Sequence, residues 1–262
     1  MTKPTLEHRS DFFKATKQVN QDHVLIVLNY SLPSFVPLLW EQSRLRVCAD
    51  GGANRIYDEL PRIFQEEEES AVRARYIPDA IVGDLDSLRP DVRDFYTQNS
   101  VPIIDLSHDQ DTSDLHKCIK YAQGANPSLT QQSKLLVVGA VGGRLDHQLS
   151  NIHILYKFRD LRIVLLGKGN LALLLPEAFE HEIYPDRGVE GPICALIPVG
   201  SPVSDVHSTG LRWNLGGQSL QFGELISTSN EIKAERISVR AKGPLLWTTE
   251  LTGTPGLQTS SS

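Results

Sequence analysis

The clearest chemical signal in the sequence is a pair of carboxylates, Asp84 and Asp86, directly after the apolar run Ala80-Ile81-Val82. If this run is a buried strand, the i, i+2 spacing lets both side chains point to one side at its carboxyl end, where open α/β sheets bind ligands. At about 6 Å and an effective dielectric near 20, two such charges repel by roughly 3 kcal/mol. We therefore expect a divalent cation or a shared proton between them. An aspartate-rich turn that caps the next helix is the alternative.

Further aspartates follow other apolar segments in the same way. Each of them alone could be the N-cap of the helix that begins there, because a short acidic side chain accepts hydrogen bonds from free backbone N–H groups. Four independent helix caps would be a coincidence, and one shared site is the more economical interpretation. These further aspartates are Asp50, Asp111, Asp114 and Asp146.

A glycine-rich segment supplies the opposite charge. The apolar run 135–138 leads into Gly139-Ala140-Val141-Gly142-Gly143-Arg144, and helical spacing follows from Leu145. A strand, a glycine-rich turn and a helix amino terminus form an anion site, because free N–H groups and the helix dipole point at the ligand. The segment has neither the P-loop pattern nor the dinucleotide-binding pattern. Arg144 adds a planar cation suited to phosphate, and Asp146 is either a site acid or a residue that stabilises the helix dipole.

The elements that position these residues follow from hydrophobic periodicity. Through residue 166, apolar runs of strand length alternate with stretches of helical spacing, which predicts an α/β fold with a parallel sheet flanked by helices. We expect one helix from Ala53 that stops at Pro61, and another that has Asp111 at or near its N-cap and ends at Gly124. Because the carboxyl ends of parallel strands share one edge, the acids converge there, which predicts a magnesium-dependent polyphosphate site. The expected strands are 24–28, 45–49, 80–82, 101–104, 135–138 and 162–166.

The second part of the chain has a different pattern. Short β-type segments separated by turn residues predict an all-β antiparallel sandwich domain. We therefore divide the chain into an α/β domain of residues 1–167 and a β domain of residues 168–262, with a disordered tail from Thr252. The expected strands are 181–184, 193–199, 206–213, 219–225, 236–241 and 245–251.

Composition excludes several classes of protein. The 262 residues carry a formal net charge of −6 with no basic cluster, which argues against nucleic-acid binding. The three cysteines form no C-x-x-C pair, which favours a reducing compartment and therefore the cytoplasm. Residues 1–22 show neither a signal peptide nor a transit peptide. The longest apolar run, 161–175, is broken by polar residues and too short to span a membrane.

Six short motifs, taken together and in order, resemble those of eukaryotic-type thiamin pyrophosphokinases. They run through most of the chain, in both predicted domains. One departure is Ser113, where the family commonly has threonine; the hydroxyl group is retained. The motifs are CADGGANR (48–55), GDLDS (83–87), DQDTSD (109–114), GGRLDH (142–147), TGLRWNL (209–215) and STSN (227–230).

This resemblance implies an α/β catalytic domain, a β-sandwich domain that binds thiamin, and a homodimer whose sites lie between subunits. ATP would be the donor and Mg²⁺ the cofactor. The resemblance assigns metal and phosphate binding to Asp84, Asp86 and Asp114. Around the substrates it places Asp50, Gln110, Ser113, Gly142, Gly143, Arg144 and Asp146. Thiamin contacts supplied by the other subunit would be Trp213, Ser229 and Asn230.

The implied reaction agrees with these residue types. The primary alcohol of thiamin would attack the β-phosphorus of ATP and expel AMP, a step that needs alignment and charge neutralisation. Arg144 would offset developing charge, while Asp86, Asp146 or water would take the alcohol proton. Trp213 would attract the cationic thiazolium, by roughly 0.5 to 2 kcal/mol, unless it is a core residue. Trp247 is expected in the core.

Two other functions fit part of the sequence. A D-x-D nucleotide-sugar transferase would explain Asp84 and Asp86, but it gives no role to the other acids or to the β domain. A non-catalytic nucleotide- or thiamin-binding module would have the metal site without turnover.

Overall fold

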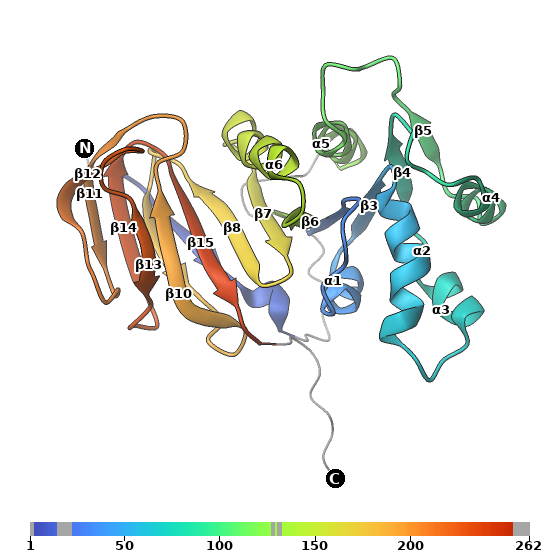
Figure 1. Ribbon diagram of the computed structural model, residues 1–262, viewed down its shortest axis with the longest axis horizontal. Helices are drawn as coiled ribbons and strands as arrows, with labels where there is room; N and C mark the ends of the chain where they lie inside the picture. Colours follow the sequence, from blue (N-terminus) through green and yellow to red (C-terminus); the bar gives the residue numbers. More distant parts are fainter. Residues whose placement is uncertain (1–2, 15–22, 127–128, 130–132, 254–262) are drawn as a thin grey trace, which may run out of the picture. The chain divides into compact units, whose positions relative to one another are not determined.

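The computed structural model describes residues 3–14, 23–126, 129 and 133–253, and the chain divides into two compact units (Figure 1). One is Thr16–Lys168; the other combines Met1–Ala15 with Gly169–Ser262. Of the tail predicted to be disordered, Thr252 and Gly253 donate backbone hydrogen bonds to the Val189 carbonyl. The remainder, 254–262, lies outside the described residues.

The first unit contains six parallel strands in the order β7-β6-β2-β3-β4-β5. Every residue of β2 (Val24–Val27) is buried. Burial on both faces explains why such strands appear in the sequence as continuous apolar runs. All six strands were predicted, with ends that differ by a few residues. They are β2 (Val24–Val27), β3 (Leu45–Ala49), β4 (Ala80–Gly83), β5 (Ile103–Asp105), β6 (Lys134–Val141) and β7 (Arg162–Gly167).

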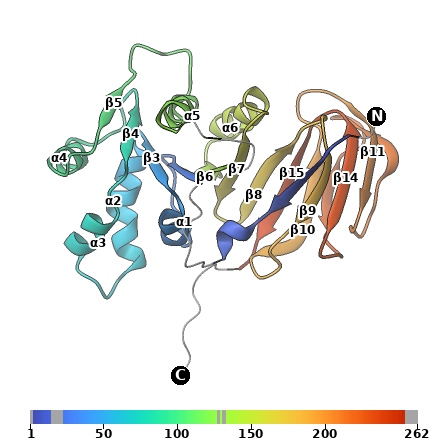
Figure 2. The same ribbon diagram turned by 180° about the vertical axis from the view of Figure 1, so that it is seen from behind.

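The strand order reverses between β2 and β6. From β2 the chain builds outward through β3, β4 and β5; it then returns to β6 on the other side of β2 and continues to β7. Helices α5 and α6 lie on the face opposite to α1 and α2 (Figures 1 and 2). A reversal of this kind opens a crevice at the carboxyl ends of the strands. The helices are α1 (Val36–Gln42), α2 (Gly52–Ile63), α3 (Glu69–Arg75), α4 (Pro90–Gln98), α5 (Asp114–Ala125) and α6 (Leu145–Lys157).

Two helix ends differ from the prediction. Helix α2 continues through Pro61, which lacks an N–H group for the Tyr57 carbonyl; Nε of Arg73 donates to that carbonyl at 3.2 Å instead. Helix α5 is capped by Ser113, whose Oγ accepts a hydrogen bond from the His116 N–H at 3.3 Å. Asp111, predicted at or near this cap, lies two residues before it in the loop, where its N–H donates to Oδ1 of Asp109.

The second unit is a β sandwich, as predicted. One sheet has the order β1-β9-β14-β11-β12, and β13, β10, β15 and β8 pair antiparallel in the other. The fully buried Trp247 belongs to its core, which confirms that prediction. The strands are β1 (Thr5–Arg9), β8 (Asn170–Leu175), β9 (Glu180–Tyr184), β10 (Glu190–Ile197), β11 (Val203–Thr209), β12 (Gly216–Leu220), β13 (Ser227–Glu231), β14 (Ile237–Lys242) and β15 (Leu245–Leu251).

The amino-terminal strand belongs to the β unit, whereas the sequence analysis assigned residues 1–167 to the α/β domain. Strand β1 pairs in parallel with β9. Nε2 of the buried His8 lies 3.0 Å from Nδ1 of His181, and Nε2 of His181 lies 2.9 Å from the Pro176 carbonyl. Because a carbonyl only accepts, His181 carries its proton on Nε2 and accepts from His8. These contacts fix β1 to the β unit.

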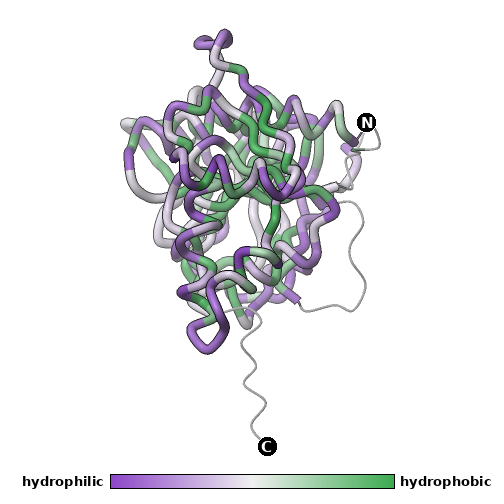
Figure 3. The backbone as a smooth tube through the Cα atoms, turned by 90° about the vertical axis from the view of Figure 1, so that its right-hand side faces the viewer, coloured by the Kyte–Doolittle hydropathy of each residue, from purple (hydrophilic) through white to green (hydrophobic). Residues whose placement is uncertain are grey.

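Many of the outer turns of the chain are hydrophilic (Figure 3). Among the described residues, no helix has the length and apolar character needed to cross a membrane.

Candidate active site

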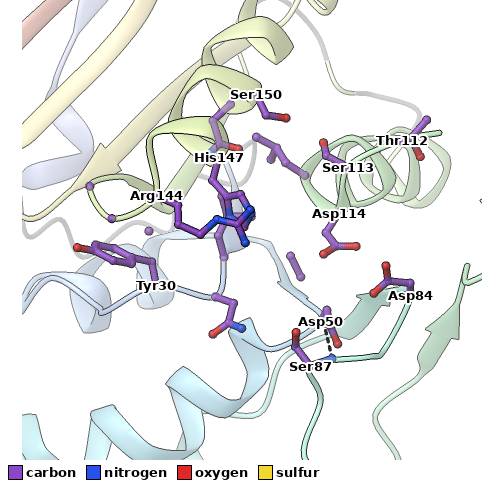
Figure 4. Close-up of a pocket in the computed structure, with 18 residues that line it drawn as sticks. Tyr30, Asp50, Asp84, Ser87, Thr112, Ser113, Asp114, Arg144, His147 and Ser150 are labelled. Atoms are coloured by element: carbon purple, nitrogen blue, oxygen red, sulfur yellow. Dashed lines mark hydrogen bonds between the residues drawn. The ribbon is translucent and has the colours of Figure 1, made fainter. Parts of the chain in front are cut away.

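A cavity of about 700 Å³ opens where the strand order reverses in the α/β unit (Figure 4). Its walls come from residues that follow β2, β3, β4 and β6 and from the first turns of α5 and α6. Three carboxylates lie on one side, and Arg144 and Tyr30 lie across from them. The sequence therefore folds as the strand-end argument requires, with polar groups from distant segments around one crevice. Lining residues include Asn29, Tyr30, Asp50, Asp84, Ser87, Ser113, Asp114, Gly142, Gly143, Arg144, His147 and Asn151.

The three carboxylates belong to Asp50, Asp84 and Asp114. Each offers an oxygen atom, and these atoms lie within 4.8 Å of one another. The Oδ1 atom of each aspartate is buried and accepts no hydrogen bond. A buried carboxylate oxygen without a donor is costly, so this cluster is built for a partner that supplies positive charge.

Asp50 sits directly after β3 in a left-handed backbone conformation, with φ of 44°. Its Oδ2 accepts a hydrogen bond from the Ser87 N–H at 3.0 Å. Burial raises the pKa of Asp50 to about 6, and the charge of Asp114 adds to that rise. Gly51, rather than Asp50, occupies the N-cap of α2, and no side chain caps that helix. The helix-cap alternative for Asp50 is therefore not what the structure shows.

Asp114 is the first residue of α5. Burial raises its pKa, and the nearby charge of Asp84 raises it further. Nζ of Lys117 lies 3.7 Å from Oδ1 of Asp114, and the Lys117 side chain is only 3% exposed. A buried ammonium group needs a compensating negative charge. Lys117 therefore provides a permanent positive charge next to the carboxylate cluster, and it was not predicted from the sequence.

Asp84 and Asp86 are separated by a turn of the backbone. Strand β4 ends at Gly83, and Leu85 adopts a left-handed conformation with φ of 64°. The prediction that both carboxylates point to one side assumed that the alternating side-chain directions of a strand continue through Asp86. The strand ends before Asp84, so this alternation does not apply to the two residues. Asp84 joins the cluster, whereas Asp86 is exposed and its Oδ1 accepts from the Ser87 hydroxyl at 2.9 Å.

Two residues hold this loop against its neighbours. A Cβ added at Gly83 would lie 2.8 Å from Cβ of Asp50, so glycine is required for the close approach of the two segments. The buried Asn54 of α2 donates through Nδ2 to the Ser87 carbonyl at 2.8 Å and accepts from the Arg89 N–H at 3.2 Å. Asn54 was not predicted as a site residue. The sequence feature that could have indicated its role is its position as a polar residue on the apolar face of the predicted helix.

The glycine-rich segment forms the opposite wall. Gly142 and Gly143 have φ of 109° and 73°, which favour glycine, and both line the cavity. Arg144 is the N-cap of α6. Its Nε and Nη2 donate to Asp146 Oδ1 and Oδ2 at 3.1 and 2.5 Å. This pairing lowers the pKa of Asp146 to about 2, so that carboxylate is a weak base.

The remaining predicted residues lie in two places. In the α/β unit, Ser113 lines the cavity, while Gln110 is exposed and its Nε2 donates to the Ser107 carbonyl. In the β unit, the buried Asn230 accepts from the Trp213 N–H at 3.2 Å and donates to its carbonyl at 2.9 Å. Trp213 itself is 55% exposed, and the Arg212 guanidinium lies 4.7 Å from its ring centre. The neighbouring Ser229 is exposed, with φ of 54°.

Comparisons with known proteins identify the family of this chain. The family model described as thiamin pyrophosphokinase, catalytic domain, matches residues 36–165, and the vitamin B1 binding domain matches residues 180–246. Thiamine pyrophosphokinase 1 of Oryza sativa subsp. japonica is 46% identical, over 96% of this chain and 99% of its own length. Thiamine pyrophosphokinase 1 of Arabidopsis thaliana is 51% identical, over 86% of this chain and 85% of its own length.

A solved structure supports the fold. The crystal structure of yeast thiamin pyrophosphokinase matches with a TM-score of 0.81 and 22% identity, over 96% of this chain and 92% of that one. Both family models and relatives near 50% identity thus cover the same two units that the structure contains. The chain belongs to the thiamin pyrophosphokinase family.

Proposed function

We propose that the protein transfers the pyrophosphoryl group of ATP to the primary alcohol of thiamin, giving thiamin diphosphate and AMP, with Mg²⁺ as cofactor. The observation that carries this proposal is the polarity of one cavity. Three carboxylates, each with a buried oxygen atom that accepts no hydrogen bond, face a helix amino terminus and an arginine. One side suits a cation and the other suits phosphates, as a magnesium polyphosphate requires.

The residues fit magnesium. Carboxylate oxygens are ligands that Mg²⁺ prefers, and the three Oδ1 atoms of Asp50, Asp84 and Asp114 accept no hydrogen bond from the protein. These residues would hold the ion; Asp86, in the same loop but exposed, stays a predicted ligand. When bound, Mg²⁺ neutralises phosphate charge and polarises the reacting phosphoryl group.

The chain's own groups orient and stabilise the phosphates. Free N–H groups in the first turn of α6 and the guanidinium of Arg144 would bind the transferred phosphoryl oxygens. To do so, Arg144 exchanges its exposed pairing with Asp146 for the phosphates. Asp86, Asp146 or water would accept the alcohol proton of thiamin; the pairing with Arg144 keeps the pKa of Asp146 low only while that pairing lasts.

Thiamin would bind to Trp213, Ser229 and Asn230, supplied by the other subunit of a homodimer. The half-exposed indole is held through its own backbone by two hydrogen bonds to Asn230, which suits cation–π contact with a thiazolium ring.

We expect Trp213→Ala to raise the KM for thiamin at least about ten-fold while the KM for ATP stays within two-fold. Equal changes in both KM values would contradict this assignment, and sedimentation tests the dimer.

The family and the three unpaired cysteines, all buried, support a location in the reducing cytoplasm. Localisation of a tagged full-length chain tests this point.

Incubation with ATP, Mg²⁺ and thiamin tests the main proposal. AMP formed in step with thiamin diphosphate supports pyrophosphoryl transfer. ADP would instead indicate transfer of a single phosphoryl group, and no turnover would favour a binding module. A nucleotide-sugar transferase would release a nucleoside diphosphate from a sugar nucleotide, and that reaction serves as the negative control.

A further inference from the structure

The ring of Tyr30 lies against the backbone of the glycine-rich wall. Tyr30 follows β2 and is partly buried. A Cβ added at Gly142 would lie 2.9 Å from Tyr30 Cε1, and one added at Gly143 would lie 2.6 Å from Cε2. Atoms from opposite edges of one ring thus contact two consecutive residues. The ring therefore fills the space that side chains at these two positions would need.

This contact matters because the glycines do not define their own conformation. Glycine occupies positive and negative φ with similar ease, so a pair of glycines needs an external contact to keep φ of 109° and 73°. Gly139, with φ of 76°, also approaches Tyr30: its added Cβ would lie 3.3 Å from Cβ of Tyr30. One aromatic side chain thus contacts three left-handed glycines of the same segment.

The backbone that carries Tyr30 is itself tied to β6. The Leu28 N–H donates to the Val138 carbonyl at 3.0 Å, and the Tyr30 N–H donates to the Leu28 carbonyl at 2.8 Å. Val138 lies immediately before the glycine-rich segment. Across the cavity from the carboxylates, Tyr30 lies on the side of Arg144 (Figure 4). The ring is therefore fixed relative to the strand from which the glycine segment departs.

We propose that Tyr30 is a positioning residue that holds Gly142 and Gly143 in the shape that presents Arg144 and the first N–H groups of α6 to phosphates. The inference rests on the proposed function and extends it. Tyr30 acts through the backbone of its neighbours, and the flat ring, rather than the hydroxyl group, is the effective part.

Substitution of Tyr30 separates positioning from general stability. We expect Tyr30→Ala to raise the KM for ATP on the order of ten-fold or more and to leave the KM for thiamin within two-fold. Tyr30→Phe keeps the ring and should stay within two-fold of wild type for both substrates. The proposal is wrong if Tyr30→Phe raises the KM for ATP as much as Tyr30→Ala does. It is also wrong if Tyr30→Ala raises the KM values for ATP and for thiamin equally. Should Tyr30→Ala not fold, Tyr30→Leu keeps the apolar volume without the flat face.

A double-mutant cycle tests the contact itself. Gly143→Ala introduces a clash with the ring in addition to backbone strain at φ of 73°. In the Tyr30→Ala background the clash is absent, so Gly143→Ala should reduce kcat/KM by a factor at least about five-fold smaller than in wild type. Gly200→Ala is the matched control, because Gly200 has φ of 90° with no atom within 4 Å of an added Cβ. Its effect should be the same in both backgrounds. Equal effects of Gly143→Ala in both backgrounds would refute the contact.

Binding of inorganic pyrophosphate with Mg²⁺, measured by calorimetry on the full chain, keeps this inference separate from the proposed function. Tyr30→Ala should bind pyrophosphate about ten-fold more weakly than wild type, while Tyr30→Phe binds it equally well. If wild type forms no AMP, the proposed function fails, and the calorimetric comparison still decides the role of Tyr30. Unchanged pyrophosphate affinity in Tyr30→Ala overturns it.

Discussion

The two walls of the cavity are charged in different ways. On one wall, Asp50, Asp84 and Asp114 are held by buried elements, and each keeps an oxygen atom without a donor. On the other wall, Arg144 is paired with Asp146, which does not line the cavity; their side chains are 70% and 62% exposed. The acidic wall is therefore costly to fold and fixed before a ligand arrives, whereas the basic wall is solvated and adaptable. Substitutions on the two walls should differ in their balance of stability and activity.

The largest effect is expected on the acidic wall. Asp84→Asn or Asp114→Asn should reduce turnover by about 10³-fold, because a cation ligand is lost. For Asp84→Asn, the melting temperature of the metal-free protein should stay the same or rise, since one of three repelling carboxylates is gone. For Asp114→Asn it should fall, because the buried ammonium group of Lys117 loses its counter-charge. The rise in melting temperature caused by Mg²⁺ should disappear. Asp94→Asn, an exposed substitution on α4, is the control that keeps both properties.

The basic wall should show the opposite balance. Arg144→Ala is expected to reduce kcat/KM by about 10²-fold at an unchanged melting temperature, because exposed ion pairs contribute little to stability. Asp146→Asn releases the guanidinium group of Arg144 and should reduce kcat/KM by less than about five-fold. Steady-state kinetics and thermal melts check both. An equal loss in the two variants would instead make Asp146 a participant in the reaction.

Lys117 tests the comparison further, because it is a buried positive charge within the acidic wall. Lys117→Met should lower the melting temperature of the metal-free protein by several degrees, since about 1 kcal/mol corresponds to roughly 2–4 °C in a chain of this size. The stabilisation by Mg²⁺ should become larger, because a competing positive charge is gone. The control is Lys120→Met, an exposed lysine on the same helix. A smaller Mg²⁺ effect in Lys117→Met would contradict the charge argument.

The smallest effect is a dependence on pH. Because the pKa of Asp50 is raised to about 6 in the folded state, protonation stabilises the metal-free fold below the ordinary aspartate pKa, and this contribution is lost as the pH rises through 6. Mg²⁺ binds the ionised form, so its stabilising effect should grow through about pH 6 and then level off. In Asp50→Asn this growth should be reduced.

The difference between melts with and without Mg²⁺ is the proper measurement. His181 is buried with a pKa lowered to about 4, so it destabilises the fold as the pH falls below the ordinary histidine pKa. That effect is common to both melts and cancels in the difference. A stabilisation by Mg²⁺ that does not change between pH 4 and pH 7 would contradict the assignment of Asp50.

Strands of the parallel sheet were predictable because burial on both faces leaves a continuous apolar run. Strands β1, β8 and β13 were missed. In β1 and β13, Thr5–Arg9 and Ser227–Glu231 are mostly polar, and their pairing is set by distant partners. Strand β8 follows β7 after only two residues, so the two strands form one interrupted apolar run in the sequence. The continuation of α2 past Pro61 depends on Arg73, which replaces the missing donor from another helix. Such compensation is tertiary and leaves no local signal.

Within the site, strand-end logic found Asp50, Asp84 and Asp114, because topology alone brings those positions together. It could not separate Asp86 from Asp84, since the left-handed conformation of Leu85 is not signalled by a leucine. Tyr30 was missed for a related reason. Its contact with Gly142 and Gly143 is created by neighbouring strands that lie far apart in the sequence.

The left-handed backbone of Asp50 has a consequence for selection experiments. Glycine at this position would relieve backbone strain on the order of 1 kcal/mol and remove a charge from a crowded cluster. A library of variants screened only for heat resistance should therefore accumulate Asp50→Gly, while a screen for thiamin diphosphate formation should eliminate it. The frequency of Asp50→Gly should therefore differ between the two screens. Such a difference would identify Asp50 as a residue that is kept for its chemistry although it lowers the stability of the fold.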